Sequence, residues 1–115
     1  MSALWLMAVV LTFQWDSQGC TAGMMLVQGT PVPASQPKSE VRLSVVKNLP
    51  AGCATTYTVP NGDYIFAIWA GQHPTTGVML ESNRCRVTVY PDKPWTTDCP
   101  GLGGNPKTPI NFKVP

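Results

Sequence analysis

The chain has 115 residues, of which 43% are hydrophobic and only 12% charged, and its formal net charge is +2 at pH 7. This length suits one domain and is too short for two, and the composition argues for a folded core and against disorder. The eight basic residues include no run of adjacent charges, so nucleic acid and anionic membrane surfaces are not indicated as partners.

The first 19 residues are predicted to be a secretory signal peptide. An unbroken apolar run, LWLMAVVLTF from residue 4 to residue 13, is followed by a polar stretch and by Ser17 and Gly19, small residues suited to a cleavage site. The run is about half as long as the roughly 20 residues of a spanning helix, so no membrane span is expected. Cleavage after Gly19 and cleavage after Ala22 both fit. The alternative is a hydrophobic strand or helix of the mature fold; as a strand it would carry residues 5, 7, 9, 11, 13 and 15 on one side.

Export would place the four cysteines in an oxidising compartment, where short chains usually pair them in disulfides. No pair has the C-x-x-C spacing of a zinc or redox site and His73 is the single histidine, so no metal or other cofactor is expected. Closing the loop from Cys85 to Cys99 would stabilise the fold by about 3 kcal/mol. Of the possible connectivities we favour Cys85 with Cys99 and Cys20 with Cys53.

The segment after the leader, residues 20 to 39, is predicted to be an N-terminal arm. From residue 28 onward it carries Pro31, Pro33 and Pro37 among polar residues, which opposes both a helix and a central strand. A β domain is expected to fill residues 40 to 115.

Alternating apolar residues predict strands over residues 40 to 48, 53 to 59, 64 to 70, 84 to 90 and 110 to 114, with 77 to 81 as a further candidate. Short strands separated by turn residues, with no amphipathic helix after the leader, predict an all-β fold, a small disulfide-stabilised antiparallel β-sandwich of about five to seven strands. The strand over 64 to 70 is apolar on both faces. It is therefore expected to be central and covered on both sides, or to meet a partner with one face.

The turn Pro60-Asn61-Gly62-Asp63 is the strongest local signal, because Asn and Gly tolerate the positive φ of a tight hairpin. The flanking strands are expected to be antiparallel neighbours in a meander. In a meander Cys53 and Cys85 would lie about 20 Å apart, too far for a disulfide. The stretch from Val59 to Phe66 also resembles the Pro-Gly-x-Tyr turn and strand of several extracellular sandwich families, including prealbumin-like and bacterial surface-repeat domains. This resemblance implies a sandwich architecture and no particular site.

Catalytic groups are scarce in this chain. Nucleophilic catalysis of the Ser-His-Asp kind needs an imidazole held by a third group, and His73 lies in a loop where an exposed, inactive histidine is expected. Asp63, Asp92 and Asp98 occupy turn-like segments, where aspartate usually caps its own backbone. The chain is therefore predicted not to be an enzyme.

Aromatic and arginine side chains are the better functional lead. One tryptophan ends the two-sided strand and two further aromatic residues flank a Pro-Asp-Lys-Pro turn, where rigid rings suit contact with proteins or sugars. Three arginines on one side of the sheet are expected to form a small cationic patch able to hold a carboxylate or sulfate. The expected partner-binding residues are Trp69, Tyr90, Trp95, Arg42, Arg84 and Arg86.

Together these features predict a small secreted, non-enzymatic binding domain that recognises an extracellular protein or glycan. The alternative is a self-assembling structural subunit of an extracellular coat, wall or filament, in which the arm or an apolar strand reaches into a neighbouring copy. The alternative requires a homo-oligomer, whereas the binding domain does not.

Overall fold

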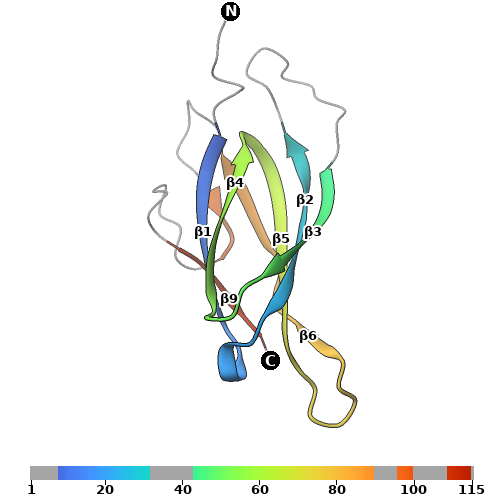
Figure 1. Ribbon diagram of the computed structural model, residues 1–115. Coiled ribbons are helices and arrows are strands. Elements are labelled where there is room, and N and C mark those ends of the chain that lie inside the picture. The colour runs from blue at the N-terminus through green and yellow to red at the C-terminus, as the bar shows by residue number, and fades with distance from the viewer. Residues whose placement is uncertain (1–7, 32–42, 90–95, 100–108, 115) are drawn as a thin grey trace, which may run out of the picture.

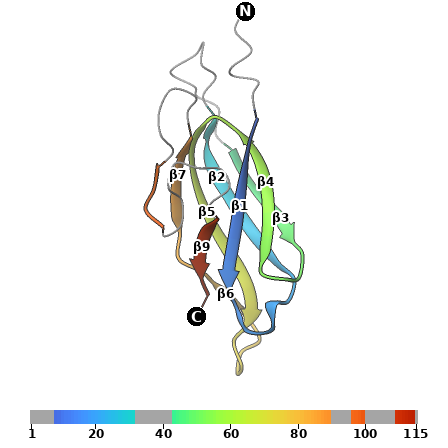
Figure 2. The same cartoon turned by 90° about the vertical axis from the view of Figure 1, so that its left-hand side faces the viewer.

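The computed structural model describes residues 8–31, 43–89, 96–99 and 109–114. Over these residues the chain forms nine β-strands and one short 3-10 turn. The strands lie in two sheets that pack face to face (Figures 1 and 2). The predicted fold class, a small all-β sandwich with two disulfides, is confirmed.

One sheet has three strands, in the order β4 (Ala54–Pro60), β1 (Ala8–Asp16) and β9 (Ile110–Lys113). The other has six strands, in the order β3 (Leu43–Leu49), β2 (Gly23–Pro31), β5 (Gly62–Gln72), β7 (Cys85–Val89) and β8 (Thr96–Thr97), with β6 (Met79–Glu81) also paired to β5. The 3-10 turn η2 (Gln18–Cys20) joins β1 to β2. All described pairs are antiparallel except β1 with β9, which is parallel.

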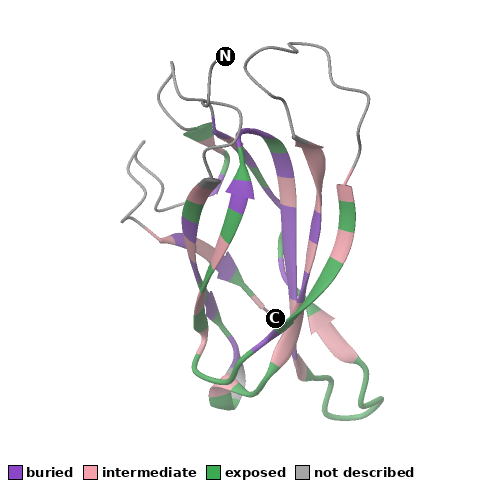
Figure 3. Ribbon diagram, turned by 45° about the horizontal axis from the view of Figure 1, so that its top comes forward, coloured by how far each residue is buried: buried purple, intermediate pink, exposed green. Residues whose placement is uncertain are grey.

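The core between the sheets follows from period-two alternation along the strands. Figure 3 shows buried and exposed residues alternating along the strands. On β4, for example, Val59 is buried and residues 54, 56 and 58 are exposed. Phe13 of β1 and Phe66 of β5 meet across the core, with ring centroids 4.9 Å apart and planes tilted by 59°. This tilted geometry is favourable for aromatic pairs, and it ties one sheet to the other.

Strand β1 is the middle strand of the three-stranded sheet and pairs with β4 on one side and β9 on the other. Leu11 and Phe13 are fully buried in the core and Trp15 is 5% exposed. The apolar run predicted as the centre of a signal peptide thus continues into a core strand, whose odd-numbered residues share the inward face. Cleavage after Gly19 stays a prediction, and it would remove this strand.

Strand β2 lies between β3 and β5, within the segment that was expected to be an arm. Met25 and Val27 are buried in the core, whereas Gln28 and Thr30 are only half-buried. The expectation that residues 28 to 31 avoid a central strand is wrong. Pro31 is compatible with the strand because it lies at its last position and pairs with Gly62 alone among the described residues.

The predicted hairpin at Asn61-Gly62 is wrong, because the chain crosses there from one sheet to the other. Strand β4 pairs with β1, while β5 pairs with β2, β6 and β7. At this crossing the Tyr64 hydroxyl donates a hydrogen bond to the Pro60 carbonyl oxygen at 2.6 Å. A tyrosine bonded back to the preceding backbone is the tyrosine corner of Greek-key sandwiches. The strands therefore do not form the expected meander.

Both favoured disulfides are present. Cys20 and Cys53 join η2 to the segment before β4, with their Cα atoms 5.0 Å apart. Cys85 and Cys99 join the start of β7 to the segment after β8, with a Cα separation of 5.5 Å. The pairing is correct even though the meander used to argue for it is not, since β4 and β7 belong to opposite sheets.

Candidate functional site

The outer face of the six-stranded sheet carries the candidate site. On β5, Tyr64, Phe66 and Ile68 are buried in the core, so the residues between them point to the other side of the sheet. The neighbouring strands obey the same alternation, and their register with β5 places their outward side chains in rows.

Two of these rows are mainly polar. The first row is Thr30 of β2, Asp63 of β5 and Thr88 of β7. The second row is Ser44 of β3, Gln28 of β2, Ile65 of β5 and Arg86 of β7. Four adjacent strands therefore contribute side chains to one compact area.

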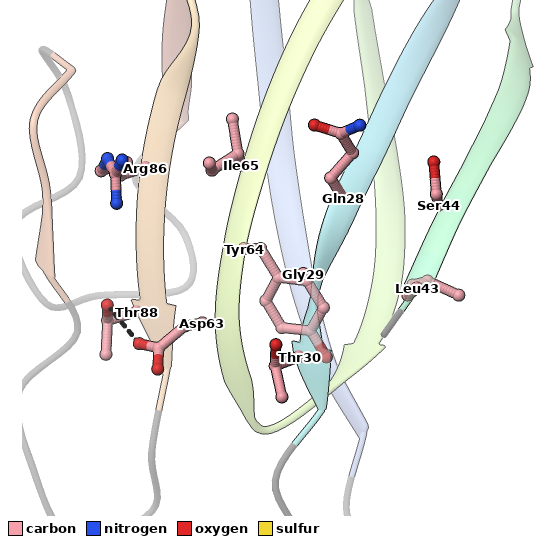
Figure 4. Close-up of a pocket in the computed structure, with 10 residues that line it drawn as sticks. All are labelled: Gln28, Gly29, Thr30, Leu43, Ser44, Asp63, Tyr64, Ile65, Arg86 and Thr88. Carbon is pink, nitrogen blue, oxygen red and sulfur yellow. Dashed lines mark hydrogen bonds between the residues drawn. The ribbon is translucent and has the colours of Figure 1, made fainter. Parts of the chain in front are cut away.

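The two rows line a hollow with a volume of about 540 Å³ (Figure 4), to which Gly29, Leu43 and Tyr64 also contribute. This volume lies within the roughly 300 to 1,000 Å³ typical of small-molecule sites. Short hydroxyl side chains leave the space open, and Gly29 offers only backbone. The hollow is thus a consequence of the residue sizes on β2, β3 and β7.

The hollow presents both donors and acceptors of hydrogen bonds. Hydroxyl groups come from Ser44, Thr30 and Thr88, an amide from Gln28, and a carboxylate from Asp63. The Thr88 hydroxyl donates to Asp63 Oδ1 at 2.8 Å, which orients the carboxylate (Figure 4). Between the polar groups lies the half-buried apolar side chain of Ile65. A ligand with several hydroxyl groups and an apolar face would match this set.

The two described arginines of the predicted patch differ in their surroundings. Arg84 Nη2 lies 3.5 Å from Glu81 Oε1, and both side chains are exposed. Such a surface pair contributes little stability, but it offsets the charge of Arg84. Arg86 lines the hollow, and within the described part of the chain its guanidinium has no ion-pair partner. The backbone N–H of Arg86 donates to Asp98 Oδ1 at 2.8 Å, which fixes the strand at this position.

Trp69 lies on the same outer face as Arg86 but outside the hollow. It is half-buried and lies opposite Met24 of β2 and Glu81 of β6. It lies four positions after Ile65 on β5, which is roughly 13 Å along a strand. A ligand that touches both Trp69 and Arg86 must therefore be extended.

Three predicted binding residues, Arg42, Tyr90 and Trp95, lie outside the described residues, as does Asp92. Gln28, Thr30 and Ser44 line the hollow but are not among the residues predicted from the sequence, because the sequence predicts no strand over β2 and does not give its neighbours. The signal that could have found them is the alternation of apolar and polar residues from Met25 to Thr30.

His73 is exposed in the turn between β5 and β6, where it has a structural contact. Its Nδ1 accepts hydrogen bonds from the backbone N–H groups of Thr75 and Thr76, at 3.1 and 3.2 Å. The described segments contain no group of three or more His, Cys, Asp or Glu side chains placed to hold a metal ion. Nor do they contain a helix long and apolar enough to cross a bilayer.

No protein-family model, curated protein or solved structure matches this chain. A function must therefore be inferred from the chemistry and geometry of the hollow.

Proposed function

We propose that this protein is a non-enzymatic binding domain that works outside the cell and recognises a glycan through the outer face of its six-stranded sheet. The observation that carries the proposal is the hollow of about 540 Å³, lined by side chains of four adjacent strands. Groups held on paired strands are already ordered, so a ligand would bind with little loss of side-chain and loop freedom.

The two disulfides support the extracellular part of the proposal. Cys20–Cys53 and Cys85–Cys99 would form and persist in an oxidising compartment, whereas cytosolic proteins keep most thiols reduced. Cleavage after Ala22 would remove Cys20 and the first of these bridges, whereas cleavage after Gly19 would keep all four cysteines.

The size of the hollow favours a glycan over a protein. From β3 to β7 the lining strands span three inter-strand spacings, or roughly 14 Å. A standard protein interface buries about 800 Å² on each partner, which is far more than this area supplies. Hydroxyl, amide and carboxylate groups around an apolar Ile65 suit a sugar ring, which has polar edges and an apolar face.

Glycan-array binding would test this proposal with one blocking variant and one matched control. Ser44→Trp would place an indole in the hollow, while Thr58→Trp adds the same ring to the exposed outer face of β4 in the other sheet. We expect the wild type and Thr58→Trp to bind a common set of glycans that Ser44→Trp does not bind. A wild-type protein that binds no glycan, or a Ser44→Trp variant that binds as well as the wild type, would contradict the proposal.

A second candidate function is self-assembly, and the edge strand β3 favours it. Among the described strands β3 pairs with β2 alone, and Val46 on its outer side is 53% exposed. An edge of this kind can accept a strand from another copy. Size-exclusion chromatography with light scattering distinguishes the two candidates, since a monomer at high concentration argues against self-assembly.

A further inference from the structure

The charges that line the hollow are unevenly placed. Among the described lining residues Arg86 carries the positive charge and Asp63 the negative charge. Arg86 is paired with Ile65, and Asp63 with Thr88, so the two charged residues are diagonal neighbours on β7 and β5. Diagonal neighbours in a sheet are roughly 7 to 8 Å apart.

This separation gives a ligand a preferred direction. An anionic group of the ligand would be attracted to Arg86, at one margin of the hollow. Neutral hydroxyl groups can face Asp63, whose carboxylate accepts hydrogen bonds, and can face Thr88 and Gln28 as well. Figure 4 places Arg86 on β7 at one margin of the hollow and Ser44 on β3 at the other.

We infer that the ligand is a saccharide bearing a carboxylate, as in a uronic or sialic acid residue, and that Arg86 binds this carboxylate. The inference rests on the proposed glycan-binding function and specifies the ligand class. A guanidinium is planar and presents paired N–H donors that match the two oxygens of a carboxylate. The ring of the sugar then lies over Ile65, and its hydroxyl groups face the polar side chains of β2 and β3.

Arg84 provides a matched control for Arg86. Both arginines are exposed and lie two residues apart, so replacing either by glutamine changes the net charge equally. Arg84 is paired with Glu81 and does not line the hollow, whereas Arg86 does. A difference in ligand affinity between the two variants therefore reflects a contact in the hollow and not the net charge of the protein.

Isothermal titration calorimetry at low salt would use two pairs of probes. Tetragalacturonate is compared with its methyl ester, and sialyllactose with lactose, so that the two pairs distinguish the source of the carboxylate. At least one acid should bind ten-fold or more tightly than its neutral counterpart. Arg86→Gln should weaken that binding roughly ten- to hundred-fold, Arg86→Lys should weaken it less, and Arg84→Gln should change it less than two-fold. Affinity should also fall as salt is added.

Failure of this inference differs from failure of the proposed function. Equal binding of the acids and their neutral counterparts, with loss in Ser44→Trp, would overturn the inference and keep the glycan-binding face. Equal weakening by Arg84→Gln and Arg86→Gln would also overturn it, because the effect would then be one of net charge. Circular dichroism of each variant checks that the fold is retained.

Discussion

Gly29 of β2 and Tyr64 of β5 lie opposite each other, and the tyrosine occupies the space that a side chain at position 29 would need. A Cβ on Gly29 would come within 2.5 Å of Tyr64 Cδ1 and 2.4 Å of the Asp63 carbonyl oxygen. Because the second contact is with backbone, Gly29→Ala would have to separate two paired strands. We expect its free energy of unfolding to fall by about 1 to 3 kcal/mol, measured by urea unfolding followed by tryptophan fluorescence.

The control for this variant is Ser44→Ala on the neighbouring strand. Ser44 is exposed, and substitutions at such positions usually change stability by less than about 0.5 kcal/mol. Wild-type stability in Gly29→Ala would mean that β2 and β5 do not approach each other as closely as described.

The corner between the two sheets gives a second prediction. The Tyr64 hydroxyl donates to the Pro60 carbonyl oxygen at 2.6 Å, and Tyr64 is almost fully buried. Tyr64→Phe keeps the ring in the core but removes this donor, so we expect a loss of about 1 to 2 kcal/mol in urea unfolding. Tyr57→Phe is the matched control: Tyr57 is only half-buried, and Lys47 Nζ lies over its ring, 5.3 Å from the centroid, a contact that phenylalanine preserves. Equal stability of the two variants would show that the hydrogen bond from Tyr64 to Pro60 does not stabilise the fold.

The crossing between the sheets, from Pro60 to Gly62, shows which features of the fold could be predicted from the sequence and which could not. Alternating burial is a local property of the chain, so the strands over residues 43–49, 54–60 and 85–89 could be predicted closely. The break between two strands at Asn61 could also be predicted, although the hairpin expected there is wrong. Whether the strands beside a turn pair or separate depends on contacts with distant strands, here β1 for β4 and β2 for β5, and no local pattern reports those contacts.

The candidate site could be predicted only in part, for the same reason. The outward direction of Arg86 follows from the alternation along β7, because Cys85 and Val87 are buried. Its neighbours in the hollow come from β2 and β3, and only the register of the sheet brings Gln28 and Ser44 to its row. The end of β2 lies in a polar, proline-rich stretch that does not predict a strand, so the sequence does not predict this row of side chains.

Asn83 gives a third prediction, because it links the Cys85–Cys99 disulfide to β9. Its Nδ2 lies 3.2 Å from Cys99 Sγ, and its Oδ1 accepts a hydrogen bond from the Lys113 backbone N–H at 2.8 Å. We expect Asn83→Ala to speed hydrogen exchange at the Lys113 amide and to lower stability by about 1 kcal/mol. Asn83→Asp keeps the acceptor and should keep the Lys113 amide protected from exchange. Asn48→Ala, at an exposed position of β3, should leave the exchange rate of this amide unchanged. Unchanged exchange in Asn83→Ala would contradict the link to β9.

The fourth prediction concerns β1, which cleavage after Gly19 would remove. Replacing one fully buried side chain such as Leu11 or Phe13 by alanine costs about 2 to 5 kcal/mol, and the whole stability of a domain is about 5 to 15 kcal/mol. A chain that begins at Cys20 loses both side chains and the strand between β4 and β9, so we expect it not to fold as this sandwich. A chain that begins at Ala8 keeps β1 and should unfold cooperatively in urea, with both disulfides formed. Cooperative unfolding of the Cys20 chain at the same urea concentration would show that β1 is dispensable, and the N-terminal sequence of the exported protein would identify which chain exists outside the cell.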